Sequence, residues 1–253
     1  MLARQRHQEI LNRVGRAGAV RVSELAQWLN VAEETIRRDL EKLDSEGKLI
    51  RTHGGAMPLP EERREVPFDV RRARHSAEKE SIGAAAARFV GEGDIIALDA
   101  SSTVYCLARA LPDRPLTVLT NSMEVATLLM SRPRIQVVST GGMLDVASQS
   151  FVGSFAEEAL SRLHIGKLFL SSKGVDLVRG LSEAADEHAR LKRRMMDLAD
   201  ETYLLADHSK FGVKSVVFFA DVKDVDVVIT DRRVDPAVLP KLDRRHVRTE
   251  IAE

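Results

Sequence analysis

Residues 22–49 read VSELAQWLNVAEETIRRDLEKLDSEGKL, and this stretch decides the fold of the N-terminal part of the chain. Apolar residues recur in it with the spacing of one buried helical face, first at Val22, Leu25, Ala26 and Leu29, then at Ile36, Leu40 and Leu43. Asn30-Val31 interrupts the pattern between the two groups. The stretch therefore predicts two short helices joined by a tight turn, as in a helix-turn-helix.

The polar face of the second predicted helix is rich in side chains that suit DNA. It would carry Glu34, Thr35, Arg37, Arg38 and Lys42. The planar fork of arginine can donate two hydrogen bonds at once to guanine or phosphate, and the second helix of this motif enters the major groove. Apolar spacing alone is equally compatible with a helical hairpin that binds no DNA.

The segment that follows favours the DNA-binding interpretation. Residues 47–56, GKLIRTHGGA, predict a turn and a strand with a basic and polar tip formed by Arg51, His53 and Gly54. Such a β-hairpin, or wing, can lie along the DNA backbone beside the recognition helix. Residues 19–22 are expected to be extended and to pair with the wing. Ser23, at the start of the first helix, completes the predicted DNA-contacting set.

The amino-acid composition says more about the cellular compartment of the protein than about its function. Lysine plus arginine equals aspartate plus glutamate, at 38 each, in a chain of 253 residues. Net charge therefore gives no indication of nucleic acid, and DNA binding must depend on where the charges lie. The single cysteine, Cys106, excludes an intrachain disulfide and fits a reducing cytosol. No run approaches the ~20 apolar residues of a membrane span, so we expect a cytoplasmic protein without membrane contact.

The chain divides into three predicted regions: a winged helix-turn-helix at 1–57, a linker at 58–75 and an effector-binding domain at 76–253. A first amphipathic helix is expected at 5–14, with Arg6 pointing outward. The linker combines prolines with mixed charges, as in a solvated connector. The alternative is that its arginines contact DNA or transmit an effector signal.

From Ser76 onward, short apolar strands alternate with helices. This alternation predicts an α/β domain with a mostly parallel sheet covered on both faces. The last two strands of the series are expected at 216–219 and 225–229. The sequence does not predict where the tail after residue 232 lies in the fold.

In such sheets, ligands bind beyond the carboxyl ends of the strands. The polar residues at these ends form the predicted effector site, which comprises Asp99, Ser101, Ser102, Thr103, Thr120, Asn121, Ser122, Gly141, Gly142, Lys173, Gly174, Asp207, Ser209 and Lys210. Each group by itself is also explained by helix capping or chain turning. Several groups meeting at one edge favour a ligand.

The residue types at that edge suggest the chemistry of the ligand. Hydroxyl groups and free backbone N–H groups at the start of the helix at 101–111 suit a phosphate, whose charge Lys173 and Lys210 would neutralise. Asp99 and Asp207 would accept hydrogen bonds from sugar hydroxyls. Together these residues favour a small phosphorylated polyol.

The run from Arg6 to Ala56, with RHQEIL, TIRRDL and HGGA, resembles the winged helix of the DeoR family of bacterial sugar-operon regulators. The second half, with LDASSTVYCLARAL, LTVLTNSMEVA and LLADHSKFG, is similar to the sensor domain of that family. The resemblance implies a fold of the ribose-5-phosphate isomerase type and a phosphorylated sugar effector, with Glu187 and Lys192 among the matched positions. Two residues depart from the family pattern: Ala32, where serine is common, and Lys173, where an acid is common.

Two alternatives remain beside the regulator. One is a sugar-phosphate isomerase-like enzyme with an accessory DNA-binding domain, for which Asp99, Glu183 and Asp207 are the possible acids and bases. The other is a winged helix that binds protein rather than DNA. Against catalysis, His188 is expected at the surface and Cys106 in packing, and neither metal-ligand spacing nor a cofactor is predicted.

The sequence as a whole predicts a repressor of a sugar-metabolism operon. Its partners would be double-stranded operator DNA and a phosphorylated sugar. A single winged helix makes few contacts with DNA, so a homo-oligomer, either dimer or tetramer, is expected.

Overall fold

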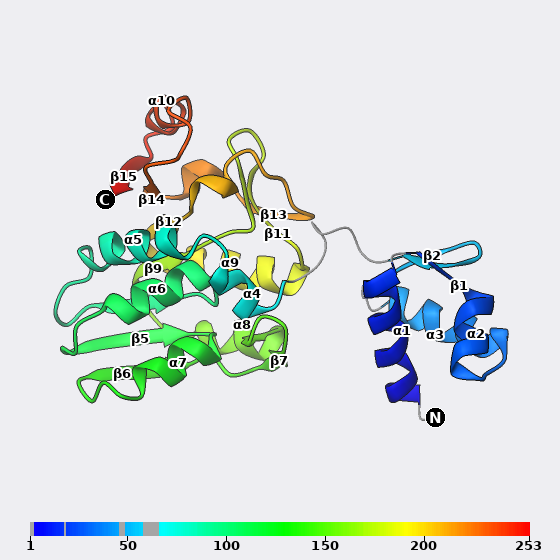
Figure 1. Ribbon diagram of the computed structural model, residues 1–253. Helices are drawn as coiled ribbons and strands as arrows, with labels where there is room; N and C mark the ends of the chain where they lie inside the picture. Colours follow the sequence, from blue (N-terminus) through cyan, green and yellow to red (C-terminus); the bar gives the residue numbers. More distant parts are fainter. Residues whose placement is uncertain (1–2, 18, 46–48, 58–65) are drawn as a thin grey trace. The chain divides into compact units, whose positions relative to one another are not determined.

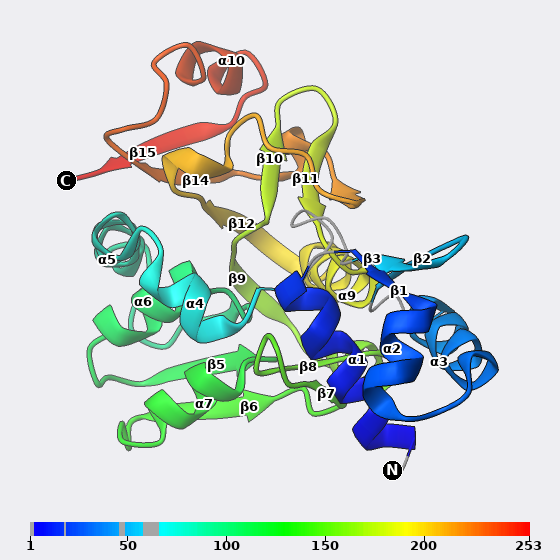
Figure 2. The ribbon, with the colours of Figure 1, turned by 45° about the vertical axis from the view of Figure 1, so that its right-hand side comes forward.

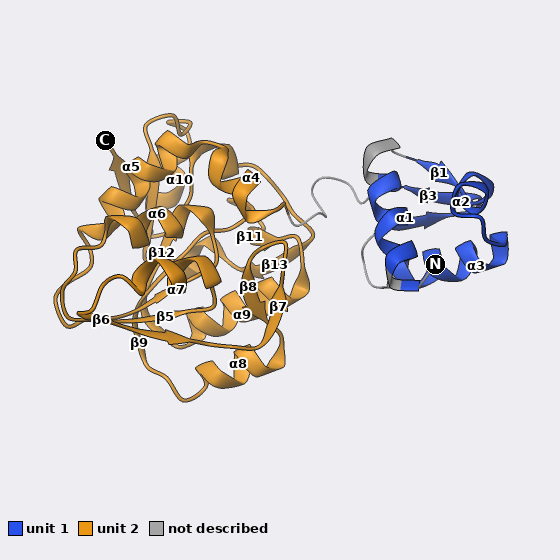
Figure 3. Ribbon diagram, turned by 60° about the horizontal axis from the view of Figure 1, so that its bottom comes forward, with its two compact units in different colours: residues 1–64 blue, residues 65–253 orange. Residues whose placement is uncertain are grey.

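The computed structural model describes residues 3–17, 19–45, 49–57 and 66–253. The chain forms two compact units, Met1–Arg64 and Glu65–Glu253 (Figures 1 and 3). The expected turn at residues 47–48 and the first half of the expected linker, residues 58–65, lie outside the described residues.

The first unit is a winged helix-turn-helix. Its elements are α1 (Ala3–Ala17), β1 (Val20–Arg21), α2 (Val22–Leu29), α3 (Glu33–Ser45), β2 (Ile50–Thr52) and β3 (Gly55–Met57). The apolar faces predicted from the sequence are buried together in one core. Asn30 ends α2 in the left-handed conformation, with φ of 51°. The expected pairing of residues 19–22 with the wing is confirmed, since β1 pairs with β3 and β3 with β2, both antiparallel.

One ion pair ties α1 to α3 and corrects the expectation for Arg6. The guanidinium of Arg6 does not point outward: Nε and Nη2 donate to the two carboxylate oxygens of Asp39, at 2.5 and 3.1 Å. His7 Nε2 bonds the same carboxylate at 2.8 Å. Asp39 is buried because α1 covers this side of α3. Within TIRRDL, the aspartate therefore faces inward while Arg37 and Arg38 are exposed.

A single tryptophan lies on the surface of this unit. Trp28 projects from α2 with nearly half of its side chain exposed, and the Arg13 guanidinium carbon lies 5.4 Å from the ring centroid.

The second unit is built on a seven-stranded parallel sheet with the order β15-β14-β12-β9-β4-β5-β6 (Figure 1). Its strands are β4 (Ile95–Leu98), β5 (Leu116–Thr120), β6 (Ile135–Ser139), β9 (Ile165–Leu170), β12 (Ala199–Leu205), β14 (Val227–Asp231) and β15 (Arg248–Ala252). Every neighbouring pair in this sheet is parallel, so the carboxyl ends meet at one edge. The predicted fold class is thereby confirmed.

Helices cover both faces of this sheet. The helices of the unit are α4 (Phe68–Ala73), α5 (Ser76–Ala87), α6 (Ser102–Ala110), α7 (Met123–Leu129), α8 (Ser154–Leu160), α9 (Asp186–Asp197) and α10 (Leu239–Asp243). One apolar cluster joins the sheet to α5, α6 and α7. A second joins the other face to α8, α9 and α10.

Two small antiparallel sheets lie beside the large one, and the sequence did not predict them (Figure 2). β7 (Met143–Asp145) pairs with β8 (Ser150–Val152). β10 (Gly174–Asp176) and β11 (Gly180–Glu183) form a hairpin that continues to β13 (Val217–Ala220). The expectation that residues 216–219 extend the main series is therefore wrong. The unassigned tail supplies α10 and the edge strand β15.

The stretch expected to be a linker ends earlier than residue 75. α4 belongs to the second unit and is held there by Phe68, which is buried and meets the Tyr105 ring edge-on at 5.6 Å. Phe68 N also donates to Ala147 O at 2.9 Å. Among the described residues, no helix is both long and apolar enough to span a membrane.

Candidate DNA-contacting surface and ligand cavity

The exposed face of α3 carries the charges that the sequence placed there. The side chains of Arg37 and Arg38 are 49% and 78% exposed, and Glu34 and Lys42 are exposed beside them. Thr35 is half-buried. Arg37 Nη2 donates to Glu33 Oε2 at 2.7 Å, and Arg38 Nε lies 3.5 Å from Glu34 Oε1. Because these pairs are exposed, the guanidinium groups can exchange their carboxylate partners for phosphate or base atoms.

The wing residues are also at the surface of this unit. Arg51, His53 and Gly54 are exposed at the turn between β2 and β3, and Ser23 is exposed in the first turn of α2. Arg51 N donates to Asp44 Oδ1 at 3.0 Å, which fastens the base of the wing to the end of α3. The second helix of the motif and the wing are therefore joined within the first unit, and both carry exposed charged or polar side chains.

A cavity of about 200 Å³ opens at the carboxyl ends of the strands in the second unit. Eight of the predicted effector residues line it, namely Ser101, Ser102, Thr103, Asn121, Lys173, Asp207, Ser209 and Lys210. Ser101 caps α6, because its Oγ accepts a hydrogen bond from Val104 N at 3.2 Å. The first N–H groups of any helix lack intrahelical acceptors, so the start of α6 offers donors to an anion.

The cavity lining is rich in cations, several of which the sequence analysis did not assign to the site. Besides Lys173 and Lys210, the lining includes Arg71, Arg74, Lys79 and Lys192. Among the described residues, the Lys210 ammonium makes no ion pair, so it has charge to offer a ligand. Arg71 and Arg74 belong to the charged stretch before residue 75. The mixed charges of that stretch favoured its interpretation as a connector, so the sequence did not indicate that these two arginines line a cavity.

Lys79 fastens the segment after α4 to this wall. Its Nζ donates to the carbonyl oxygens of Arg71 and, at 2.7 Å, of Arg74. Burial lowers the pKa of Lys79 to about 8, against the opposing charge of Asp207. α4 is thereby held to the start of α5 at the edge of the cavity.

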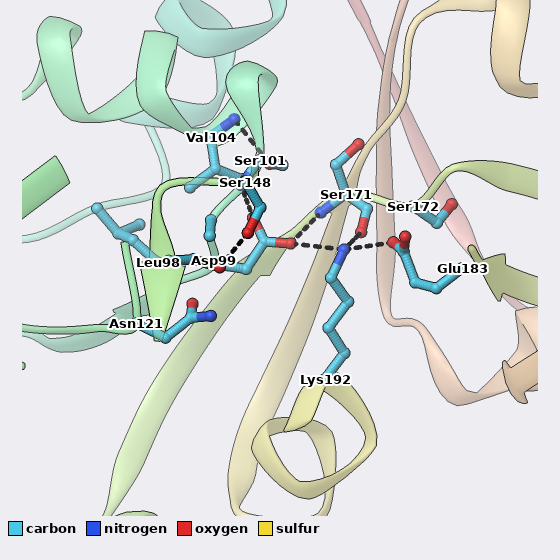
Figure 4. A network of polar contacts seen from close by, with 12 residues as sticks. Leu98, Asp99, Ser101, Val104, Asn121, Ser148, Ser171, Ser172, Glu183 and Lys192 are labelled. Atoms are coloured by element: carbon cyan, nitrogen blue, oxygen red, sulfur yellow. Dashed lines mark hydrogen bonds and ion pairs between the residues drawn. The ribbon is translucent and has the colours of Figure 1, made fainter. Parts of the chain in front are cut away.

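An ion network supports the floor of the cavity (Figure 4). Lys192 Nζ lies 3.1 Å from Asp99 Oδ2, bonds Glu183 Oε1 at 2.5 Å and donates to Ser171 O at 2.6 Å. Burial alone would lower the pKa of Lys192, but the charges of Asp99 and Glu183 raise it above its usual value. Burial alone would raise the pKa of Glu183, but Lys192 lowers it. Lys192 and Glu183 are therefore both held in their charged forms.

Asp99 has a supporting position rather than the expected contact with a ligand. Its Oδ1 accepts from Ser101 N at 3.0 Å, and its Oδ2 accepts from Ser171 N at 3.1 Å. Both oxygens are thus committed to the loops after β4 and β9. The carboxylate fixes the loops that carry the hydroxyl groups of Ser101, Ser102, Ser171 and Ser172 into the cavity wall.

Two buried acceptor atoms in the cavity wall have no partner within the described part of the chain. They are Oδ2 of Asp207 and Oδ1 of Asn121. The other oxygen of Asp207 accepts from Ser209 N at 3.0 Å, and Asn121 Nδ2 donates to Phe151 O at 3.1 Å. A buried acceptor without a donor is costly, so these atoms suit a ligand that brings hydroxyl groups.

The remaining predicted residues lie outside the cavity lining, and most have structural roles. Thr120 Oγ1 donates to Leu98 O at 2.7 Å, and Ser122 caps α7. Gly142 has φ of 116°, and a Cβ there would meet Val152 O at 2.9 Å. Gly174 passes so close to Val213 that a Cβ would meet its carbonyl oxygen at 2.4 Å. Gly141 and Glu187 are also absent from the lining.

His188 is buried in the cavity wall, so the expectation of a surface residue is wrong. Its Nε2 donates to Asp145 Oδ2 at 3.1 Å, and Ser148 Oγ donates to the same oxygen at 2.6 Å. Burial alone would raise the pKa of Asp145, but these hydrogen bonds lower it to about 2. The sequence missed this because Asp145 comes from the hairpin β7–β8, which it did not predict. Cys106 is buried as expected, and burial raises the pKa of its thiol.

Comparison with known proteins agrees with both halves of this arrangement. Residues 6–60 match the model of the DeoR-like helix-turn-helix domain, and residues 74–232 match the model of the DeoR C terminal sensor domain. The second match includes all the predicted effector residues.

Relatives resemble the chain over nearly its full length. The HTH-type transcriptional regulator YulB of Bacillus subtilis is 44% identical over 98% of this chain and 96% of its own. The L-fucose operon activator of Haemophilus influenzae is 36% identical over 95% and 96%. The HTH-type transcriptional repressor GlcR of Bacillus subtilis is 34% identical over 100% and 98%.

Solved structures resemble the chain more distantly. Ribose 5-phosphate isomerase A from Methanocaldococcus jannaschii is 18% identical, with a TM-score of 0.40 over 53% of each chain. The matched family and the curated relatives are regulators, not enzymes. The chain therefore belongs to the DeoR family of DNA-binding transcriptional regulators.

Proposed function

We propose that the protein represses a sugar-metabolism operon and that a phosphorylated sugar in the cavity of the second unit changes its affinity for operator DNA. The named relatives include a repressor and the activator of an L-fucose operon, so the target class follows from kinship. Such a regulator would act in the cytoplasm, as a dimer or tetramer that reads paired half-sites.

In this proposal Arg38, Arg37 and Lys42 meet DNA from α3, with Glu34, Thr35 and Ser23 beside them. Arg51, His53 and Gly54 meet the backbone from the wing. Support comes from the exposure of the two arginines on the face of α3 opposite its buried apolar residues. Arginine in this position is suited to bidentate contacts in the major groove.

The observation that carries the effector proposal is the pairing of two features in one cavity. Cations and the start of α6 favour a phosphate, while the partnerless acceptors of Asp207 and Asn121 favour hydroxyl donors. A phosphorylated polyol supplies both. Lys210, Lys173 and the hydroxyls of Ser101, Ser102, Thr103 and Ser209 would hold the phosphate end.

Two arginines of the cavity wall could couple ligand binding to the DNA-binding unit, because they lie close to it in the sequence. Arg71 and Arg74 follow directly on the stretch that joins the two units, and both line the cavity. A phosphate that draws these guanidinium groups inward would change the position of α4. We propose that this segment is the coupling element.

The DNA half of the proposal is tested with fragments selected from genomic DNA by the full-length protein. Arg38→Ala should weaken binding to a selected fragment by about 1–3 kcal/mol if the side chain contacts a base. Arg134→Ala is the matched control, because Arg134 is an exposed arginine near a glutamate in the second unit. Equal losses for both variants would contradict the proposed interface.

The effector half is tested by thermal unfolding against a panel of sugar phosphates, the parent sugars and inorganic phosphate. A ligand at a hundred times its dissociation constant should add ~2.7 kcal/mol to the free energy of unfolding. Lys210→Ala should lose that response and keep binding to the selected DNA fragment. A panel without any stabilising sugar phosphate, or an unchanged response in the variant, would place the effector elsewhere.

A further inference from the structure

A cluster of three metal-ligating side chains lies at the edge of the cavity. His75, Glu78 and His208 each present one ligand atom, and these atoms all lie within 4.8 Å of one another. His75 immediately precedes α5, Glu78 is in its first turn, and His208 begins the short helix η2 (His208–Lys210). His75 and Glu78 are three residues apart, but His208 comes from a distant part of the chain, so sequence spacing alone did not reveal the cluster.

A buried carboxylate orients one of the two imidazoles. His208 Nδ1 lies 3.1 and 3.2 Å from the two oxygens of Asp231, which is buried. His208 N also donates to Asp231 Oδ2 at 2.7 Å. When Nδ1 donates to a carboxylate, the lone pair of the neutral ring is on Nε2. This carboxylate–histidine arrangement accompanies most histidine ligands of metals.

The second imidazole is brought to the first by an unfavourable backbone conformation. His75 has φ of 52°, in the left-handed region that residues other than glycine seldom occupy. Its ring centroid lies 5.2 Å from that of His208, with the ring planes nearly perpendicular. A backbone conformation of this kind persists only where surrounding contacts impose it. In this protein it accompanies the close approach of the imidazoles of His75 and His208 to the carboxylate of Glu78.

We propose that His75, Glu78 and His208 bind a divalent transition-metal ion of the zinc class. Two imidazoles and one carboxylate leave a fourth position open in a tetrahedral zinc site. Magnesium and calcium prefer oxygen ligands, so they fit this donor set poorly. Glu78 Oε1 is 2.7 Å from Arg233 Nη1, which leaves Oε2 for the ion.

The site borders the cavity but does not depend on the identity of its ligand. His75 lines the cavity, and so do Asp207 and Ser209, the neighbours of His208 in the chain. The ligand atoms must approach one another on binding, since zinc–nitrogen bonds are about 2.0–2.1 Å long. Metal binding should therefore order the junction between α5 and η2 at this edge.

The test titrates metal-free, tag-free full-length protein with Zn²⁺ by calorimetry and follows the thermal midpoint. We expect one ion per chain and a rise in the midpoint. His75→Ala and His208→Ala should abolish both, and Asp231→Asn should weaken binding by ~10–100-fold through His208. Replacement of Zn²⁺ by Co²⁺ should give the visible absorption bands of a four-coordinate site with nitrogen and oxygen ligands.

His164→Ala is the matched control. Its imidazole also meets a carboxylate, Asp200 at 3.3 Å, but both side chains are exposed and no third ligand from the described residues joins them. Zinc binding by His75→Ala equal to that of the unmodified protein would overturn the proposal, and His75 is exposed, so this variant should still fold. A sugar-phosphate response measured with chelator present tests the proposed function separately.

Discussion

The two units place the same kinds of charged side chain in opposite settings. On α3, Arg37 and Arg38 are exposed and pair with acids one helical turn away. In the cavity floor, the side chain of Lys192 is only 12% exposed and lies between Asp99 and Glu183. Exposed pairs of the first kind contribute little to folding, whereas a buried network is costly to break. The comparison teaches that the exposed charges on α3 are available for the proposed DNA contacts, whereas the charges around Lys192 stabilise the fold of the second unit.

The largest effect should come from the buried network. Lys192→Met leaves two carboxylates without their cation and should lower the free energy of unfolding of the second unit by about 3–5 kcal/mol. Denaturant unfolding measures this. Arg190→Met on the same helix is the control, since Arg190 is exposed and should stay within about 0.5 kcal/mol. A loss under 1 kcal/mol for Lys192→Met would remove the contrast between the units.

The next effect tests whether the first unit has a buried pair of its own. Asp39→Asn removes the carboxylate that joins Arg6 and His7 to α3. Because hydrogen bonds to charged groups contribute more than neutral ones, we expect a loss of about 1.5–3 kcal/mol in the stability of this unit. Denaturant unfolding measures it, with Glu41→Gln, which changes an exposed carboxylate of the same helix, for comparison. Equal stability of the two variants would show that α1 is held by apolar packing alone.

A third effect depends on pH. Asp145 has a folded pKa of about 2 against an ordinary 3.8, so its ionised form stabilises the fold above pH 4. That stability is lost as pH falls through the folded pKa, and the shift corresponds to at most about 2 kcal/mol. Unfolding measured between pH 5 and pH 2 should show this slope. Asp145→Asn should have a correspondingly smaller slope, and an identical profile would contradict the assignment.

The smallest effect on stability should come from the recognition helix. Arg37→Ala breaks an exposed pair with Glu33 and should change the free energy of unfolding by no more than about 0.5 kcal/mol. The same variant should bind a selected DNA fragment more weakly. A large loss of stability with unchanged DNA binding would reverse the assigned role of this arginine.

Local pattern predicted the first unit nearly in full, because apolar spacing alone fixes which helical faces are buried. It also located Ser101, Ser102 and Asp207, which follow apolar strands directly. It failed where contacts join distant segments. The partner of His188 comes from an unpredicted hairpin, and the cations Arg71 and Lys79 come from before the first strand. Asp99 looked like a ligand contact because the backbone groups that occupy its oxygens leave no trace in the sequence.

The position of Trp28 makes the two units optically distinguishable. It is the only tryptophan of the chain and lies on α2, while both tyrosines, Tyr105 and Tyr203, lie in the second unit. Emission excited at the red edge of indole absorption therefore comes from the first unit alone. The intact protein thus carries its own fluorophore for asking whether a sugar phosphate bound in one unit alters the surroundings of the other.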